Sequence, residues 1–277
     1  MLLCLTLINL KRKDRNSKTE KITPNYLPLT PNFLIFAALN KFLFLKKNWW
    51  KILSLLLLIY TVVAGYLHKV PDLPIIHQSI RNLYFHVCMW FAMMILFIVS
   101  FVYSIKYLRG FNLRNDIYAN NFAAVGTFFG ILGYSTGAIW ANYTWITDQS
   151  QSLGSVLKEP KLIGAAISLL IYGAYFVLRG SFTDMDKRAR ISAVYNIFAF
   201  ALLFPSIWII PRLVGSLHPG APGSDSGNPA LNAQNDLDLG MRLVFYPAVI
   251  GWTLLGVWIA TLKIRLQLFK DKTLINA

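Results

Sequence analysis

The sequence predicts an all-α integral membrane protein with six transmembrane helices. The 277 residues are 56% hydrophobic and only 14% charged, with a mean hydropathy of +0.50. This composition is too apolar for a soluble domain. A helix needs about 20 apolar residues to cross about 30 Å of hydrocarbon, and six stretches of this kind occur. They are Trp50–Leu67, Tyr84–Ile105, Asn121–Ala141, Leu162–Leu178, Ala193–Pro211 and Met241–Leu262.

The distribution of charge predicts the orientation of these helices. The formal net charge is +15, and basic residues accumulate on the cytoplasmic side of membrane proteins. The connections after the second, fourth and sixth stretches are strongly basic, whereas the other three loops hold few Lys or Arg residues. Both termini are therefore expected to be cytoplasmic and the other three loops to face outward. The positive charge is a topology signal, so no nucleic-acid partner is expected.

The chain divides into three predicted regions. Residues 46–267 form the six-span membrane domain and residues 268–277 a cytoplasmic tail, while residues 1–45 form an N-terminal extension. In the extension, a basic segment precedes the apolar Phe33–Leu45, and two alternatives stay open: disorder, or an amphipathic helix in the membrane interface. Leu2–Ile8 is too short to span, and no small-residue cleavage site follows it, which disfavours a signal peptide.

Missing motifs exclude several functions. Neither Cys4 nor Cys88 lies in Cys-x-x-Cys-His, so the chain is not a c-type cytochrome. It has no Walker motif, which excludes the ATPase of a pump, no His-Glu-x-x-His, which excludes that kind of membrane metalloprotease, and no Gly-x-Ser-x-Gly nucleophile elbow. No span has an acidic residue at its centre, which disfavours an ion-coupled carrier. Polar residues within the spans are scattered along the sequence: Ser100, Thr127, Ser168 and Asn196.

The third span carries four glycines on one helical face. They are Gly126, Gly130, Gly133 and Gly137, spaced four, three and four residues apart. A face without side chains lets another helix approach closely, and such stripes are common in membrane proteins. This stripe predicts a packing surface and says nothing about a substrate.

All four histidines map to the predicted outer side. They are His68, His77, His86 and His218. A surface imidazole is the ordinary interpretation for each, but His86 lies in the first turn of a span, where a polar side chain is a candidate functional residue. Trp90, four residues later, shares its helix face.

Two tryptophans, Trp140 and Trp145, open the second outer loop. Alone they fit an aromatic belt at the membrane interface. Combined with outward histidines and nearby basic residues, they describe a place for a flat, apolar, dianionic ligand that contains iron. Haem has these attributes, because imidazoles supply axial ligands and indoles supply planar walls. The candidate partners for its propionates are Arg81, Lys161 and Arg212.

At these residues the sequence resembles the haem-handling membrane proteins of cytochrome c biogenesis, and among them the six-span haem exporter protein C type. The resemblance covers about residues 46–267. Arg81 and His86 match an Arg-x-x-x-x-His element at the outer start of the second span, and His218 matches a Leu-His element after the fifth. Thr136, Gly137 and Trp140 match the Thr-Gly-x-x-Trp that introduces the tryptophan-rich outer loop, and Trp145 stands in place of its next tryptophan.

The outer loop departs from the family pattern after Trp145. The family continues with further tryptophans, whereas this chain has the polar stretch 146–158 before Glu159 and Lys161. Each lost ring removes contact worth on the order of 1 kcal/mol, by analogy with aromatic pairs. The sequence therefore predicts a modified tryptophan-rich loop.

The resemblance implies a multi-pass protein of the bacterial inner membrane that presents haem at the periplasmic face. Its implied part is binding and delivery rather than catalysis, with a lyase-like role in loading a haem chaperone as the alternative. Haem b would be held non-covalently by His86 and His218 as axial ligands, with Trp140 and Trp145 as walls and Arg81 near a propionate. The implied partners are a membrane-anchored haem chaperone and the ATPase and permease subunits of an ABC-type complex. Two alternatives are a permease subunit for a small molecule and a homologue with impaired haem binding.

Overall fold

The computed structural model describes residues 31–72, 77–145, 153–209, 213 and 237–275. For residues 31–46, 145, 153, 155, 208 and 272–275 it describes the backbone alone. The chain divides into two units, residues 1–47 and residues 48–277. Part of the predicted N-terminal extension is helical, since the first helix begins at Pro31. Its placement in the membrane interface stays a prediction.

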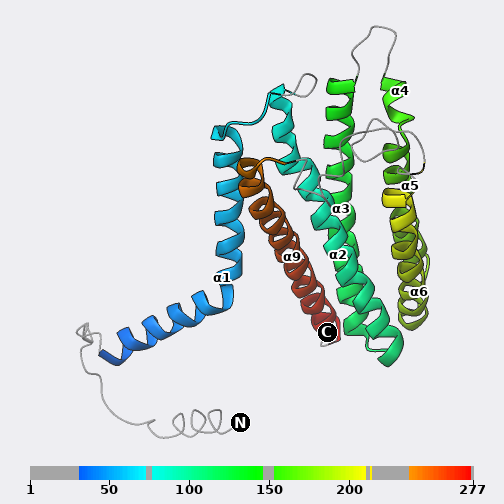
Figure 1. The fold of residues 1–277 in the computed structure, drawn as a ribbon. Coiled ribbons are helices and arrows are strands. Elements are labelled where there is room, and N and C mark those ends of the chain that lie inside the picture. The colour runs from blue at the N-terminus through cyan, green and yellow to red at the C-terminus, as the bar shows by residue number, and fades with distance from the viewer. Residues whose placement is uncertain (1–30, 73–76, 146–152, 210–212, 214–236, 276–277) are drawn as a thin grey trace, which may run out of the picture. The chain divides into compact units, whose positions relative to one another are not determined.

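The described residues form helices joined by short connections, and no strand occurs among them (Figure 1). The elements are α1 (Pro31–Leu67), the 3₁₀ helix η1 (His77–Asn82), α2 (Leu83–Gly110), α3 (Leu113–Trp145), α4 (Leu153–Leu157), α5 (Pro160–Gly180), α6 (Met185–Phe204), the π-helix η2 (Pro205–Ile209) and α9 (Leu239–Ile275). Six segments are long and apolar enough to cross a membrane, which confirms the predicted fold class. They are Lys47–Leu67, His77–Gly110, Leu113–Thr144, Pro160–Gly180, Met185–Ile207 and Leu239–Asp271.

Several helices are longer than the apolar stretches that predict them. The third stretch was expected from Asn121, but α3 begins at Leu113. Backbone hydrogen bonding continues a helix into polar sequence, because each N–H needs only a carbonyl four residues earlier. The fifth stretch behaves differently: α6 ends at Phe204 and a π-helical turn follows. Pro205 has no N–H, so the regular ladder stops there.

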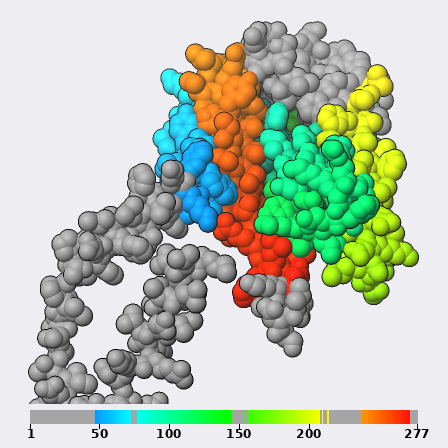
Figure 2. All heavy atoms as spheres, turned by 90° about the horizontal axis from the view of Figure 1, so that it is seen from below, coloured from blue at the N-terminus to red at the C-terminus, as the bar shows by residue number. Residues whose placement is uncertain are grey.

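Helix α2 lies at the centre of the bundle and packs against α3, α6 and α9. Figure 2 shows α9, in orange to red, between α1 in blue and the green α2–α3 pair. Two side chains of α1 donate hydrogen bonds to backbone carbonyls of α9: Ser54 donates to Gly251 and Tyr60 donates to Leu243. We call the end of the bundle with Leu83 and Trp145 the outer end and the opposite end the inner end. The assignment of these ends to membrane sides rests on charge and stays a prediction.

The glycine stripe of α3 forms one continuous contact with α2, as the sequence predicts. A methyl group on Gly126 would lie 2.8 Å from the Phe97 ring, and one on Gly130 would lie 2.8 Å from the Met93 sulfur. The other two glycines of the stripe make the same kind of contact, Gly133 with Trp90 and Gly137 with His86. These four pairs keep one antiparallel register. The two backbones therefore approach closely, which gives the helices the dispersion contact that replaces hydrophobic drive in lipid.

The contact between α2 and α6 is polar. The Asn196 side-chain amide donates hydrogen bonds to Ser100 Oγ at 2.7 Å and to Ser104 Oγ at 2.8 Å, and all three residues are fully buried. Ser100 and Asn196 therefore converge in space although they lie far apart in the sequence. The hydroxyls of Thr127 and Ser168 each donate to a carbonyl of their own helix.

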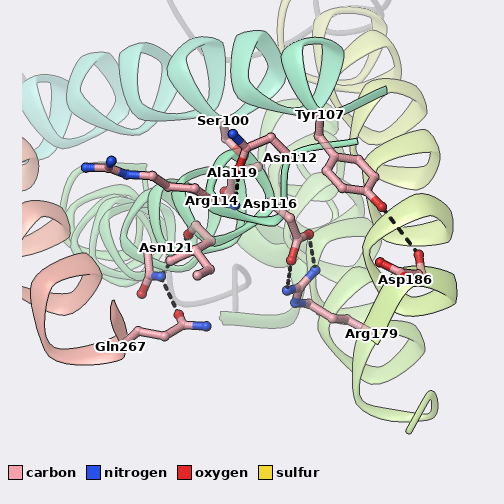
Figure 3. Close-up of polar contacts among 11 residues, drawn as sticks. Ser100, Tyr107, Asn112, Arg114, Asp116, Ala119, Asn121, Arg179, Asp186 and Gln267 are labelled. Atoms are coloured by element: carbon pink, nitrogen blue, oxygen red, sulfur yellow. Dashed lines mark hydrogen bonds and ion pairs between the residues drawn. The ribbon is translucent and has the colours of Figure 1, made fainter. Parts of the chain in front are cut away.

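A buried ion pair joins α3 and α5 at the inner end (Figure 3). The Arg179 guanidinium donates to both carboxylate oxygens of Asp116, at 2.7 and 2.6 Å, and the two side chains are only 10% and 7% exposed. The same end holds a hydrogen bond from Asn121 on α3 to Gln267 on α9. Arg179 belongs to the basic connection that follows the fourth apolar stretch. Its ion pair with Asp116 gives it a structural role as well.

Removal of the Arg179 charge should destabilise the bundle. Arg179→Gln leaves the Asp116 carboxylate buried without its cation, and breaking a buried pair in this way costs about 3–5 kcal/mol. The thermal unfolding midpoint of the purified protein measures this loss. The matched control is Arg109→Gln, because Arg109 is exposed at the same end and the chemical change is identical. Equal midpoints for the two variants would contradict a stabilising role of the pair, and Asp116→Asn should partly restore Arg179→Gln.

Candidate functional site

The imidazole of His86 is fixed at the outer end of α2 by the backbone of α3. His86 Nδ1 lies 2.8 Å from the Gly133 carbonyl oxygen and 3.3 Å from Thr136 Oγ1. A carbonyl oxygen only accepts, so Nδ1 carries the proton in this arrangement. The neutral ring then has its lone pair on Nε2. Metal-binding histidines commonly have this second-nitrogen hydrogen bond to a carbonyl, which fixes their tautomer and ring orientation.

The last glycine of the stripe provides room for this imidazole. A methyl group on Gly137 would overlap His86 Cε1 and would lie 3.0 Å from Nδ1. Gly137 therefore has a role beyond packing, because it lets the His86 ring lie close to the α3 backbone. The motif Thr136-Gly137 thus supplies both space and a polar neighbour for the histidine.

Two indole rings flank the imidazole. The His86 ring centroid lies 6.3 Å from that of Trp90 and 6.0 Å from that of Trp140, with edge-to-face angles of 83° and 70°. Trp140 is itself held in place, since its Nε1 donates to Ser79 Oγ at 3.0 Å. The structure therefore places His86 next to Trp140 and next to Trp90, which shares its helix face.

Arg81 binds the end of α1. One terminal nitrogen of its guanidinium donates to the carbonyls of Gly65, at 2.5 Å, and His68, at 2.7 Å. Its Nε and second terminal nitrogen donate to Gln78 Oε1. Four of its five N–H groups are used in this way, at a helix C-terminus where a positive charge is favourable. A contact between Arg81 and a haem propionate stays a prediction. One N–H group and the positive charge of the guanidinium are available for it.

The other two described histidines have different surroundings. His77 is exposed, and its Nδ1 lies 2.9 Å from Asp72 Oδ1. His68 packs against Gly240, so closely that a methyl group there would overlap its ring. His77 fits the ordinary interpretation of a surface imidazole, whereas His68 does not, because its Nδ1 is buried and has no hydrogen-bond partner among the described residues.

Several predicted site residues lie beyond what the structure describes. His218 and Arg212 fall outside the described residues, and Trp145 is described only as the last backbone residue of α3. Lys161 lies in the first turn of α5, after the buried Glu159. The roles of His218 and Trp145 in a shared site therefore stay predictions.

Sequence reasoning missed the residues that hold the predicted ones in place. The Gly133 carbonyl fixes His86, and the Ser79 hydroxyl fixes Trp140. The contact of His86 with the α3 backbone could have been inferred from the glycine stripe, because the stripe continues to Gly137, the residue beside His86. Nothing in the sequence indicates the hydrogen bond of Ser79 to Trp140, because a single serine in a loop has no distinguishing pattern.

A family of known proteins matches most of the chain. The family described as cytochrome c assembly protein matches residues 27–215 of this chain. The matched range includes Arg81, His86 and Trp140 and ends before His218. No curated protein is similar enough to the chain to count as a match.

Substitution of Gly137 should disturb the site through packing alone. The added methyl of Gly137→Ala meets the His86 ring, and overpacking of this kind costs about 1–3 kcal/mol. The matched control is Gly173→Ala on α5, where an added methyl meets nothing within 4 Å. The control should keep or raise the unfolding midpoint, because alanine is the better helix former. Thermal unfolding measures both, and equal midpoints would show that His86 does not occupy the space beside Gly137.

Proposed function

Because the chain belongs to the cytochrome c assembly protein family, we propose that it binds haem at the outer end of its bundle and presents it for c-type cytochrome biogenesis. Membership of the family implies a haem-related role in this process. The specific role as a haem-presenting protein, of the haem exporter protein C type, is the proposal. Haem is the cargo here, and the protein's part is binding and delivery rather than turnover.

The hydrogen bond between His86 Nδ1 and the Gly133 carbonyl is the observation that carries this proposal. The Gly133 carbonyl holds the proton on Nδ1, which gives Nε2 the lone pair that an iron ligand needs. No three His, Cys, Asp or Glu side chains converge on a metal-binding group within the described ranges. Porphyrin brings four nitrogens of its own, so one or two imidazoles are enough to complete the coordination of its iron.

The surroundings of His86 suit a flat aromatic ligand. Trp90 and Trp140 present indole rings on two sides of the imidazole. His86 is only partly buried at the end of the helix, in keeping with a cargo that has to leave again. In the proposed site His218 is the second axial ligand, Trp145 adds a wall, and Arg81 contributes positive charge near a propionate.

The proposed acceptor is a membrane-anchored haem chaperone, with the ATPase and permease subunits of an ABC-type complex as further partners. The proposed location is the bacterial inner membrane, with the site on the periplasmic side. The family and the six apolar helices support a multi-pass membrane protein. The named partners rest on the resemblance to the haem exporter protein C type.

Titration of the purified protein with haemin tests the axial ligands. The wild-type protein should give a Soret band typical of ligation by histidine. His86→Ala and His218→Ala should each weaken binding by about tenfold or more, equivalent to at least about 1.4 kcal/mol, because each removes an iron ligand.

The control for this titration is His77→Ala, since His77 is exposed and paired with Asp72. It should bind haemin as the wild type does. An unchanged Soret band and unchanged haem retention in both His86→Ala and His218→Ala would overturn the axial assignment. A wild-type protein that binds no haemin would favour a homologue that has lost the site.

A further inference from the structure

Three buried polar atoms on α6 lack hydrogen-bond partners among the described residues. They are Arg188 Nε, Ser192 Oγ and Asn196 Oδ1. Their residues are spaced four apart, so they lie in one row along the helix. Eight residues of helix cover about 12 Å, and the row therefore runs from the inner end toward the middle of the bundle.

The row faces the polar contact with α2. Asn196 donates to Ser100 Oγ and Ser104 Oγ there. Asn196 is fully buried, and Ser192 is only 1% exposed. Buried polar atoms are almost always hydrogen-bonded, and an unpaired one is costly at membrane depth, where bulk water is absent. Three such atoms in one row call for partners that lie between the helices.

The orientation of the Asn196 amide does not remove this need. Exchange of its oxygen and nitrogen would turn the oxygen toward the two serines and leave the nitrogen in the unpaired position. One polar atom of Asn196 would still lack a partner. The row needs a partner in either orientation.

The chemistry of the row selects the partner. Arg188 Nε only donates, Asn196 Oδ1 only accepts, and the Ser192 hydroxyl does both. A cation is disfavoured by the guanidinium of Arg188. An anion is disfavoured by the amide oxygen of Asn196, which occupies the unpaired position because the Ser100 hydroxyl already donates to the Ala119 carbonyl and accepts from the amide nitrogen. A small neutral molecule that both donates and accepts meets all three, and water is such a molecule.

We propose that the α2–α6 interface contains a hydration site in which buried water molecules bridge Arg188, Ser192 and Asn196. Ala189 and Ala193, next to this row on α6, are buried with small side chains, and the apolar cluster that contains them also includes Tyr107 of α2. This site is independent of the proposed haem site at the outer end. It makes the α2–α6 contact wet, in contrast to the contact between α2 and the glycines of α3.

The stability of Ser192→Ala tests the proposal. If water bridges the Ser192 hydroxyl, its removal loses a hydrogen bond, and the unfolding midpoint should fall by about 2–4 °C for a chain of this size. If the hydroxyl is dry and unpaired, its removal relieves a buried polar group, and the midpoint should stay or rise. The second result would overturn the proposal.

The matched control is Ser168→Ala on α5. Ser168 is 2% exposed, but its hydroxyl donates to the Gly164 carbonyl of its own helix at 2.9 Å. The change in side chain is the same, and no bridging partner is involved. The midpoint of this variant should therefore fall by less than that of Ser192→Ala.

A high-resolution cryo-electron microscopy map of the full chain in lipid nanodiscs gives a second measurement that does not depend on a variant. The proposal expects water density within about 3.2 Å of Ser192 Oγ and of the Asn196 amide atom that does not contact Ser100 and Ser104. Side chains packed against these atoms, with no density between them, would overturn it.

Discussion

The close antiparallel approach of α2 to α3 is the constraint on which the outer site depends. In lipid, helices gain little from hydrophobic burial against one another, so tight van der Waals contact has to hold them together. The glycines of α3 allow this contact, and each of the four glycines packs against one side chain of α2. His86 is the outermost of these side chains. Its hydrogen bond to the Gly133 carbonyl is therefore a product of helix packing, because only a bare backbone at this distance lets the imidazole reach it.

Helix α2 meets its neighbours by two different kinds of contact. Toward α3 it packs large apolar and aromatic side chains on glycine, and toward α6 it presents serine hydroxyls to a buried amide. At the inner end, the ion pair of Asp116 and Arg179 joins α3 to α5. The register of α2 against α3 is thus set by shape, while the contacts further inward are set by hydrogen bonds and charge.

The outer end combines a rigid histidine with a tethered loop. Arg81 binds the last carbonyls of α1, so the short helix η1 is joined to α1 on one side and continues into α2 on the other. Ser79 of the same short helix holds Trp140 of α3. The aromatic surroundings of His86 are therefore positioned by three different helices, and a partly exposed imidazole among them fits a role in holding and releasing a cargo.

The sequence alone determined the number and type of the helices, because the thickness of hydrocarbon fixes their length and the need to satisfy every backbone group excludes open strands. It also determined the glycine face and identified His86 and Trp140, since both signals are local in the chain. Only the tertiary structure decided that Arg179 pairs with Asp116, that Asn196 meets Ser100, and that the guanidinium of Arg81 binds the end of α1. Such pairs depend on which helices become neighbours and in what register, and no local pattern of residues carries that information.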